Sequence, residues 1–231
     1  MMQRARNRRW LALVFWGAWL SVVHADTEIK AGGVALTIPS PASDFAEVGD
    51  KLRTTLFELL LPSTNRLLSA YLPAQKLAEL NAGKLLGGMD LYAMLEVPRQ
   101  AEYADCTEQA FEQVLQSIDP SLANLDAKTV AQMEEEMNIH LKSIGTKPVE
   151  MGRPEILGKL FQKSNVAALA MLSGIKRDER SVNMACAFAV LRVKKRLIFA
   201  YVYRKYESPD EVIWLRKNLE AWCDAILTNN K

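Results

Sequence analysis

Two consecutive stretches near the C-terminus, Val182 to Lys194 and Arg196 to Tyr206, have the period-two alternation of β-strands and are apolar on both faces. In the first stretch, one face carries larger side chains and the other carries only alanine: Met184, Cys186, Phe188 and Val190 against Ala185, Ala187 and Ala189. Such strands are buried on both sides, so their sheet needs a covering layer on each face. The alanine face would let a helix approach closely.

Apolar spacing and turn residues place the other elements. We expect further strands at Val34–Ile38, Arg66–Leu72, Leu91–Val97, Ile156–Gln162 and Val166–Ser173, with a turn at Gly174. We expect helices at Asp50–Leu61, Asp105–Ile118, Ser121–Ile144 and Asp210–Ile226, and a short helix ending at Gly83. The last helix is the best specified, because Ser208-Pro209-Asp210-Glu211 supplies an N-cap, a proline at the first helical position and a capping-box glutamate.

These elements follow one another as an opening strand, a mixed middle, an antiparallel meander and a terminal helix. In architecture this order resembles the sandwich of the PsbP/Mog1-like families. The fold class we predict is α+β, with a largely antiparallel sheet covered by helices on both faces, that is, an αβα sandwich. No internal repeat or linker divides the sequence, so residues 26–231 are expected to form a single α+β domain.

The first 25 residues have the order of a secretory signal peptide. Four arginines precede an apolar run of 14 residues from Trp10 to Val23, and Val23-His24-Ala25 follows as a cleavage site. The run is short for crossing about 30 Å of hydrocarbon, and no later stretch is long and apolar enough to span a membrane. We therefore expect export, with the bacterial periplasm as the natural destination. An uncleaved N-terminal anchor is the alternative, and the general secretory and twin-arginine routes both stay open.

The charge and histidine content exclude several classes of function. Four of the 29 basic residues lie in the first 25, which leaves 25 basic against 27 acidic residues in 26–231. The excess positive charge expected of a nucleic-acid-binding protein is therefore absent. His140 is the one histidine left in 26–231, so a two-histidine metal site cannot form within one chain. We expect no metal and no other cofactor.

Three cysteines, Cys106, Cys186 and Cys223, remain in this region. An odd number permits at most one internal disulfide in an oxidising compartment. If one forms, we favour Cys186 with Cys223, because the strand and the final helix that carry them are expected to pack together. The alternative is that both are small buried apolar side chains. Cys106 is then the free thiol.

The segment Pro98 to Thr107 is the richest in reactive side chains. It leaves a strand and enters a helix, where backbone N–H groups favour an anion. Cys106 is a candidate nucleophile, with His140 as its base and Glu102 or Asp105 orienting the imidazole. In the alternative interpretation Asp105 caps the helix, while Arg99 and Glu102 form a solvated ion pair. We also take Arg99, Glu102 and Tyr103 as candidate binding residues.

Lys194, Lys195 and Arg196 form a basic hairpin tip and are the second candidate binding surface. Such a tip would suit an anionic membrane surface, a polyanion or an acidic partner. The alternative is that these charges keep two very apolar strands from aggregating.

Residues 26–231 contain no sequence motif that indicates a particular reaction. The function that we expect is therefore an exported, soluble, non-catalytic protein that binds a partner protein or a small ligand of the cell envelope. The alternative is an exported hydrolase or transferase that uses Cys106 or nearby carboxylates.

Overall fold

The structure is a computed structural model, and it describes residues 26–84, 89–118, 127–143, 145 and 147–231. The signal peptide predicted for residues 1–25 lies outside the described residues. So do residues 121–126 and 144 of the helix predicted for Ser121–Ile144.

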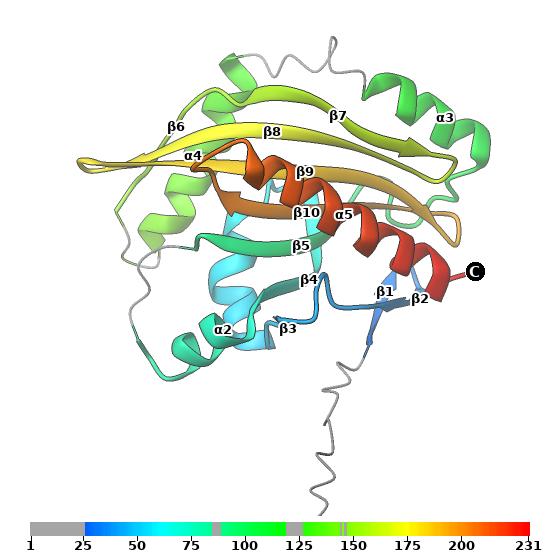
Figure 1. The fold of residues 1–231 in the computed structure, drawn as a ribbon, viewed down its shortest axis with the longest axis horizontal. Helices are drawn as coiled ribbons and strands as arrows, with labels where there is room; N and C mark the ends of the chain where they lie inside the picture. Colours follow the sequence, from blue (N-terminus) through cyan, green and yellow to red (C-terminus); the bar gives the residue numbers. More distant parts are fainter. Residues whose placement is uncertain (1–25, 85–88, 119–126, 144, 146) are drawn as a thin grey trace, which may run out of the picture.

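One large antiparallel sheet dominates the fold (Figure 1). Its strands are β3 (Phe45–Glu47), β4 (Asn65–Pro73), β5 (Leu91–Pro98), β6 (Glu150–Met151), β7 (Glu155–Lys163), β8 (Val166–Arg177), β9 (Arg180–Val193) and β10 (Arg196–Lys205). They lie in the order β3-β4-β5-β10-β9-β8-β6, and β7 also pairs with β8. Strands β7 to β10 form the predicted meander, because each pairs antiparallel with the next in the chain. A separate hairpin of β1 (Thr27–Ala31) and β2 (Val34–Ile38) precedes the sheet.

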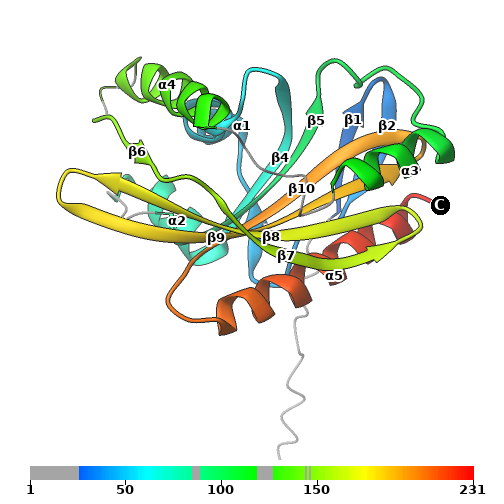
Figure 2. The same ribbon diagram turned by 90° about the horizontal axis from the view of Figure 1, so that it is seen from above.

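The C-terminal helix α5 (Asp210–Asn229) covers one face of this sheet (Figure 2). It packs chiefly on β9 and β10, over the alanine face predicted to admit a helix. Leu215, Leu219 and Trp222 of α5 are almost fully buried there. The predicted capping box at its start is also present, since Glu211 accepts hydrogen bonds from both the backbone N–H and the hydroxyl of Ser208.

Other helices cover the opposite face (Figure 2). They are α1 (Asp50–Leu52) with its irregular continuations η1 (Arg53–Phe57) and η2 (Glu58–Leu60), α3 (Glu108–Ser117) and α4 (Ala127–Ser143). A further short helix, α2 (Ala74–Asn81), contacts β3 and β4. Phe111 of α3 packs against Val190 and Phe188 of β9, so α3 rests on the large-residue face of that strand. The αβα sandwich predicted from the two apolar strands is confirmed.

The structure departs from the predicted elements at several boundaries. Gly174 lies inside β8, which continues to Arg177, and the turn falls at Asp178. β1, β3 and β6 are additional strands, and Asp50–Leu61 is not a uniform α-helix. Helix α3 begins at Glu108 with Thr107 as its N-cap, because the Thr107 hydroxyl accepts the Ala110 N–H at 3.1 Å. Asp105 therefore does not cap this helix.

The cysteines correct the disulfide prediction. Cys106, Cys186 and Cys223 are all described, all buried and all free. Cys186 lies opposite Tyr203 of β10 on the large-residue face, whereas Cys223 belongs to α5 on the alanine face. The two sulfurs are therefore on opposite sides of the sheet. The strand and the helix do pack together, but the two-residue period turns Cys186 away from the helix.

Candidate functional site

The segment Pro98–Thr107 connects β5 to α3, and we call it the 98–107 loop. It passes between two tight hairpin turns, Gly32–Gly33 of the β1–β2 hairpin and Lys194–Lys195 of the β9–β10 hairpin. Together these three segments form the turn–loop–turn surface. The structure thus brings together the two candidate binding regions that the sequence analysis treated separately.

Glu102 fixes the centre of the loop from inside. It is only 7% exposed, and its carboxylate accepts two hydrogen bonds from the Arg66 guanidinium, one of them from Nε at 3.1 Å. The Gly32 N–H also points to Glu102 Oε1 at 3.3 Å. Hydrogen bonding to Arg66 lowers the pKa of Glu102, and the charge of Arg99 lowers it further. Glu102 is therefore a buried anchor and not the solvated partner of Arg99.

The first turn is made of two glycines. Gly32 and Gly33 have φ values of +54° and +79°, as a two-residue turn between antiparallel strands requires. A Cβ on Gly32 would lie 1.9 Å from the backbone oxygen of Glu102. Loop and turn are in direct backbone contact here.

The second turn has the same conformation but is built from lysines. Lys194 and Lys195 have φ values of +45° and +62°, in the left-handed region where residues with a Cβ are disfavoured. The Lys195 carbonyl accepts the Cys106 N–H at 2.8 Å, so this turn also holds the loop. This turn contains no glycine, although glycine would adopt these positive φ values with less strain.

Two arginines beside the second turn complete the attachment. Arg196 Nη1 donates to the carbonyl of Ala104 and to Asp105 Oδ1, both at 2.8 Å, and its side chain is 12% exposed. Arg192 Nε donates to the Cys106 carbonyl at 2.8 Å. Arg196 therefore serves as a brace and does not project as part of a free basic tip.

Tyr103 projects from this braced loop into solvent. It is 76% exposed, and its Cα lies 3.1 Å from the Cβ position built on Gly32. The Tyr103 carbonyl meanwhile faces Arg196 Nη1 at 3.3 Å. The backbone beneath the ring is thus held on both sides, and the aromatic side chain itself is open to solvent.

The structure does not assemble the predicted Cys106–His140 pair. Cys106 immediately precedes α3 and His140 lies near the end of α4, and Figures 1 and 2 both place these helices at opposite ends of the sheet. Cys106 is 9% exposed, and burial raises the pKa of its thiol. A nucleophilic cysteine needs the opposite shift. Within the described part of the chain, no group of three or more His, Cys, Asp or Glu residues is arranged to hold a metal ion.

A second buried carboxylate, Glu96, was not identified from the sequence. It is 2% exposed in the middle of β5 and accepts a hydrogen bond from Asn65 Nδ2 at 2.8 Å. Burial raises its pKa to about 7, and the Asn65 hydrogen bond partly opposes the shift. The signal that could have revealed it is one glutamate inside the otherwise apolar strand Leu91–Val97.

Glu96 shares its face of the sheet with a column of aromatic rings. Tyr92 and Tyr203 stack with their centroids 4.5 Å apart, and Tyr201 stacks on Phe188 at 4.8 Å. A third contact of 6.0 Å joins Tyr203 to Tyr201, so the column crosses three neighbouring strands. These tyrosines stabilise the sheet through cross-strand packing.

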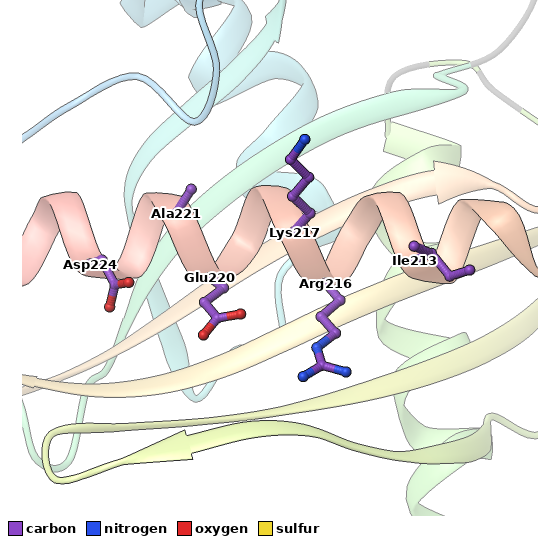
Figure 3. Close-up of a pocket in the computed structure, with 6 residues that line it drawn as sticks. All are labelled: Ile213, Arg216, Lys217, Glu220, Ala221 and Asp224. Atoms are coloured by element: carbon purple, nitrogen blue, oxygen red, sulfur yellow. The ribbon is translucent and has the colours of Figure 1, made fainter.

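A shallow hollow runs along the outer side of α5 (Figure 3). It is lined by Ile213, Arg216, Lys217, Glu220, Ala221 and Asp224. Lys163 of β7 pairs with Glu220 at 3.1 Å and with Asp224 at 2.8 Å. These carboxylates therefore tie the helix to the edge of the sheet.

Comparison with known proteins gives no family for the chain. No protein-family model matches it, and no curated protein does. Among solved structures, it is similar to the Ran-binding protein Mog1p of Saccharomyces cerevisiae, at 11% identity over 89% of this chain and 90% of that one, with a TM-score of 0.29. It is also similar to a mutant of protein Mog1, at 11% identity over 89% and 92% of the two chains, with a TM-score of 0.30.

Among the described residues, no helix is long and apolar enough to cross a membrane.

Proposed function

We propose that this chain is an exported, non-catalytic binding protein that recognises a partner protein through the turn–loop–turn surface. The observation that carries the proposal is Tyr103, a large aromatic side chain that is 76% exposed on a backbone held by two turns. Tyrosine is enriched among the residues that dominate binding energy at protein interfaces. A loop whose backbone is already held loses little conformational entropy on binding, which favours affinity.

The shape of the surface favours a protein over a small ligand. Small-molecule sites are concave and enclose most of their ligand. Tyr103 instead points outward from its loop, so it would enter a recess on the partner. The arrangement of Cys106 also supports a role without catalysis, because the thiol is buried and packs against Phe111 and Val190.

Capture of partners from the cell envelope tests this function. The tagged protein, its Tyr103→Ala variant and its Ile213→Ala variant are compared for the proteins they retain. Ile213 is the matched control, since it is 66% exposed but lies on α5. We expect Tyr103→Ala to lower retention of a specific partner by about tenfold or more, and Ile213→Ala to leave it unchanged. Equal retention by all three proteins would contradict the proposal.

A further inference from the structure

Near Tyr103, the acidic side chains form ion pairs within the protein, whereas several basic side chains do not. Each of three acidic residues on the turn–loop–turn surface and at the start of α3 already pairs with an arginine: Glu102 with Arg66, Asp105 with Arg196, and Glu108 with Arg192. These ion pairs neutralise the acidic side chains of the surface within the protein itself. They leave its remaining charges almost entirely positive.

Four exposed cations lie on this surface or on β1 beside it: Lys30, Arg99, Lys194 and Lys195. Within the described residues none of the four has a carboxylate within ion-pair distance. Lys30 belongs to β1 near the first turn, and its carbonyl is held by Arg66. Arg99 is attached through its Nε to the Asn65 carbonyl at 3.0 Å. The cations therefore come from three separate segments that the fold brings to one surface.

This positive surface lies on a molecule whose residues 26–231 carry slightly more acidic than basic groups. The charge distribution is thus uneven. A local positive field around an exposed anchor orients a negatively charged partner before contact and raises its rate of association.

Backbone strain at the second turn points in the same direction. Lys194 and Lys195 occupy left-handed conformations that Asn-Gly would adopt at lower cost, as Gly32–Gly33 does across the loop. Strain of this kind persists where the side chains serve a purpose. The turn that holds the Tyr103 loop carries two exposed positive charges, of which Lys194 Nζ also donates to the Ala35 carbonyl at 3.3 Å, and these charges supply such a purpose.

We propose that the turn–loop–turn surface binds an acidic segment of a partner protein, in which carboxylates flank an apolar recess that receives the Tyr103 ring. The inference rests on the proposed function and adds the chemistry of the partner. A protein is favoured over an anionic membrane because Tyr103 is the one large apolar side chain exposed here. The other exposed large apolar residues of the described chain, Ile139, Leu157 and Ile213, lie on α4, β7 and α5. Stable docking on a lipid surface needs a broader apolar face.

Photo-cross-linking of the full chain in its own cells tests this inference. A benzophenone amino acid replaces Tyr103, or Ile213 as the control position, and the cross-linked species are identified by mass spectrometry. We expect the Tyr103 position to cross-link a protein through a peptide rich in Asp and Glu. The Ile213 position should not cross-link that protein.

A double variant separates charge from folding. Lys194→Asn with Lys195→Gly removes both ammonium groups but gives the turn the residues its geometry favours, so the variant should unfold at a higher temperature than the parent. We expect its cross-linking yield at Tyr103 to fall about tenfold. The matched Lys217→Asn variant, which removes one exposed lysine from α5, should retain the parental yield.

The outcomes distinguish the two proposals. A protein adduct at Tyr103 whose yield is unchanged by the double variant would overturn the acidic partner and leave the binding function standing. An adduct with phospholipid alone would overturn the protein partner in favour of a membrane. If Tyr103 yields no adduct at all, both proposals fail.

Discussion

Glu96 and Glu102 are both buried carboxylates, six residues apart, yet their surroundings shift their pKa values in opposite directions. Glu96 receives a hydrogen bond from the neutral amide of Asn65, whereas Glu102 is paired with the cationic Arg66. Asn65 and Arg66 are consecutive in β4, so they point to opposite faces of the sheet and reach different carboxylates. Burial dominates at Glu96 and raises its pKa, while the arginine dominates at Glu102 and lowers it. A charged partner, and not burial alone, decides which carboxylate stays ionised.

The largest change in stability should come from a substitution at Gly32, which lies directly against the backbone of Glu102. Gly32→Ala places a Cβ against the Glu102 carbonyl and adds strain at a positive φ. We expect the free energy of unfolding to fall by about 3–4 kcal/mol. Gly33→Ala is the control, because its added Cβ meets nothing within 4 Å and only its φ of +79° opposes the change, at about 1 kcal/mol. Urea denaturation compares the two, and equal losses would refute the close contact.

Glu96 should make the protein less stable as the pH rises. Its pKa is about 7 in the folded state and lies near 4.5 when unfolded, so the folded state binds the proton more tightly between these values. The free energy of unfolding should therefore decrease from about pH 4.5 upward through pH 7, by on the order of 3 kcal/mol. Glu96→Gln stays neutral and should abolish this loss. Urea denaturation across pH 5 to 8 measures it, and an identical slope in the variant would remove Glu96 as its source.

Glu102 should give a smaller effect with the opposite sign. Its pKa is lowered on folding, so its stabilisation is present above its ordinary pKa and is lost as the pH falls through the folded value. At pH 7, Glu102→Gln should lower the free energy of unfolding by about 2 kcal/mol, because it removes a charge-assisted pair. The loss is limited because the Arg66 side chain is itself partly exposed to solvent. The difference between variant and parent should shrink toward pH 3. A cost that is independent of pH would indicate a loss of packing instead.

The smallest effect concerns the second turn on the far side of the same loop. Lys195→Gly should raise the free energy of unfolding by about 0.5–1 kcal/mol, since it relieves a left-handed residue while enlarging the entropy of the unfolded chain. The matched substitution Lys217→Gly in the middle of α5 should lower it by about 1 kcal/mol. Thermal unfolding distinguishes these opposite signs. Destabilisation by Lys195→Gly would show that the lysine side chain itself supports the loop.

The candidate site combines features that local sequence patterns predict with features that they do not. The 98–107 loop and the Lys194–Lys195 tip were both identified, because reactive residues after a strand and charges in a turn are local patterns. Their meeting was not predicted, since it joins segments about 90 residues apart. For Glu102 the sequence suggested Arg99, three residues away, but Arg66, 36 residues away, is the partner.

The predicted Cys186–Cys223 disulfide is wrong, and the buried Glu96 was not predicted, for two different reasons. The phase of Cys186 with Met184 and Phe188 already turned it away from the alanine face, so the information needed was present in the sequence. Packing of the strand against the helix permits a disulfide only where both side chains point into the space between them. Glu96 differs, because the apolar surroundings that raise its pKa come from neighbouring strands and helices that local spacing cannot identify.

By itself, the sequence determined the fold class. Two strands apolar on both faces require a layer on each side of the sheet, and period and capping residues place the strands and helices because these depend on near neighbours in the chain. Only the tertiary structure decided the partners of the buried charges, the separation of the cysteines and the attachment of one loop between two distant turns. Those features depend on strand order and on which faces meet, and long-range packing fixes both.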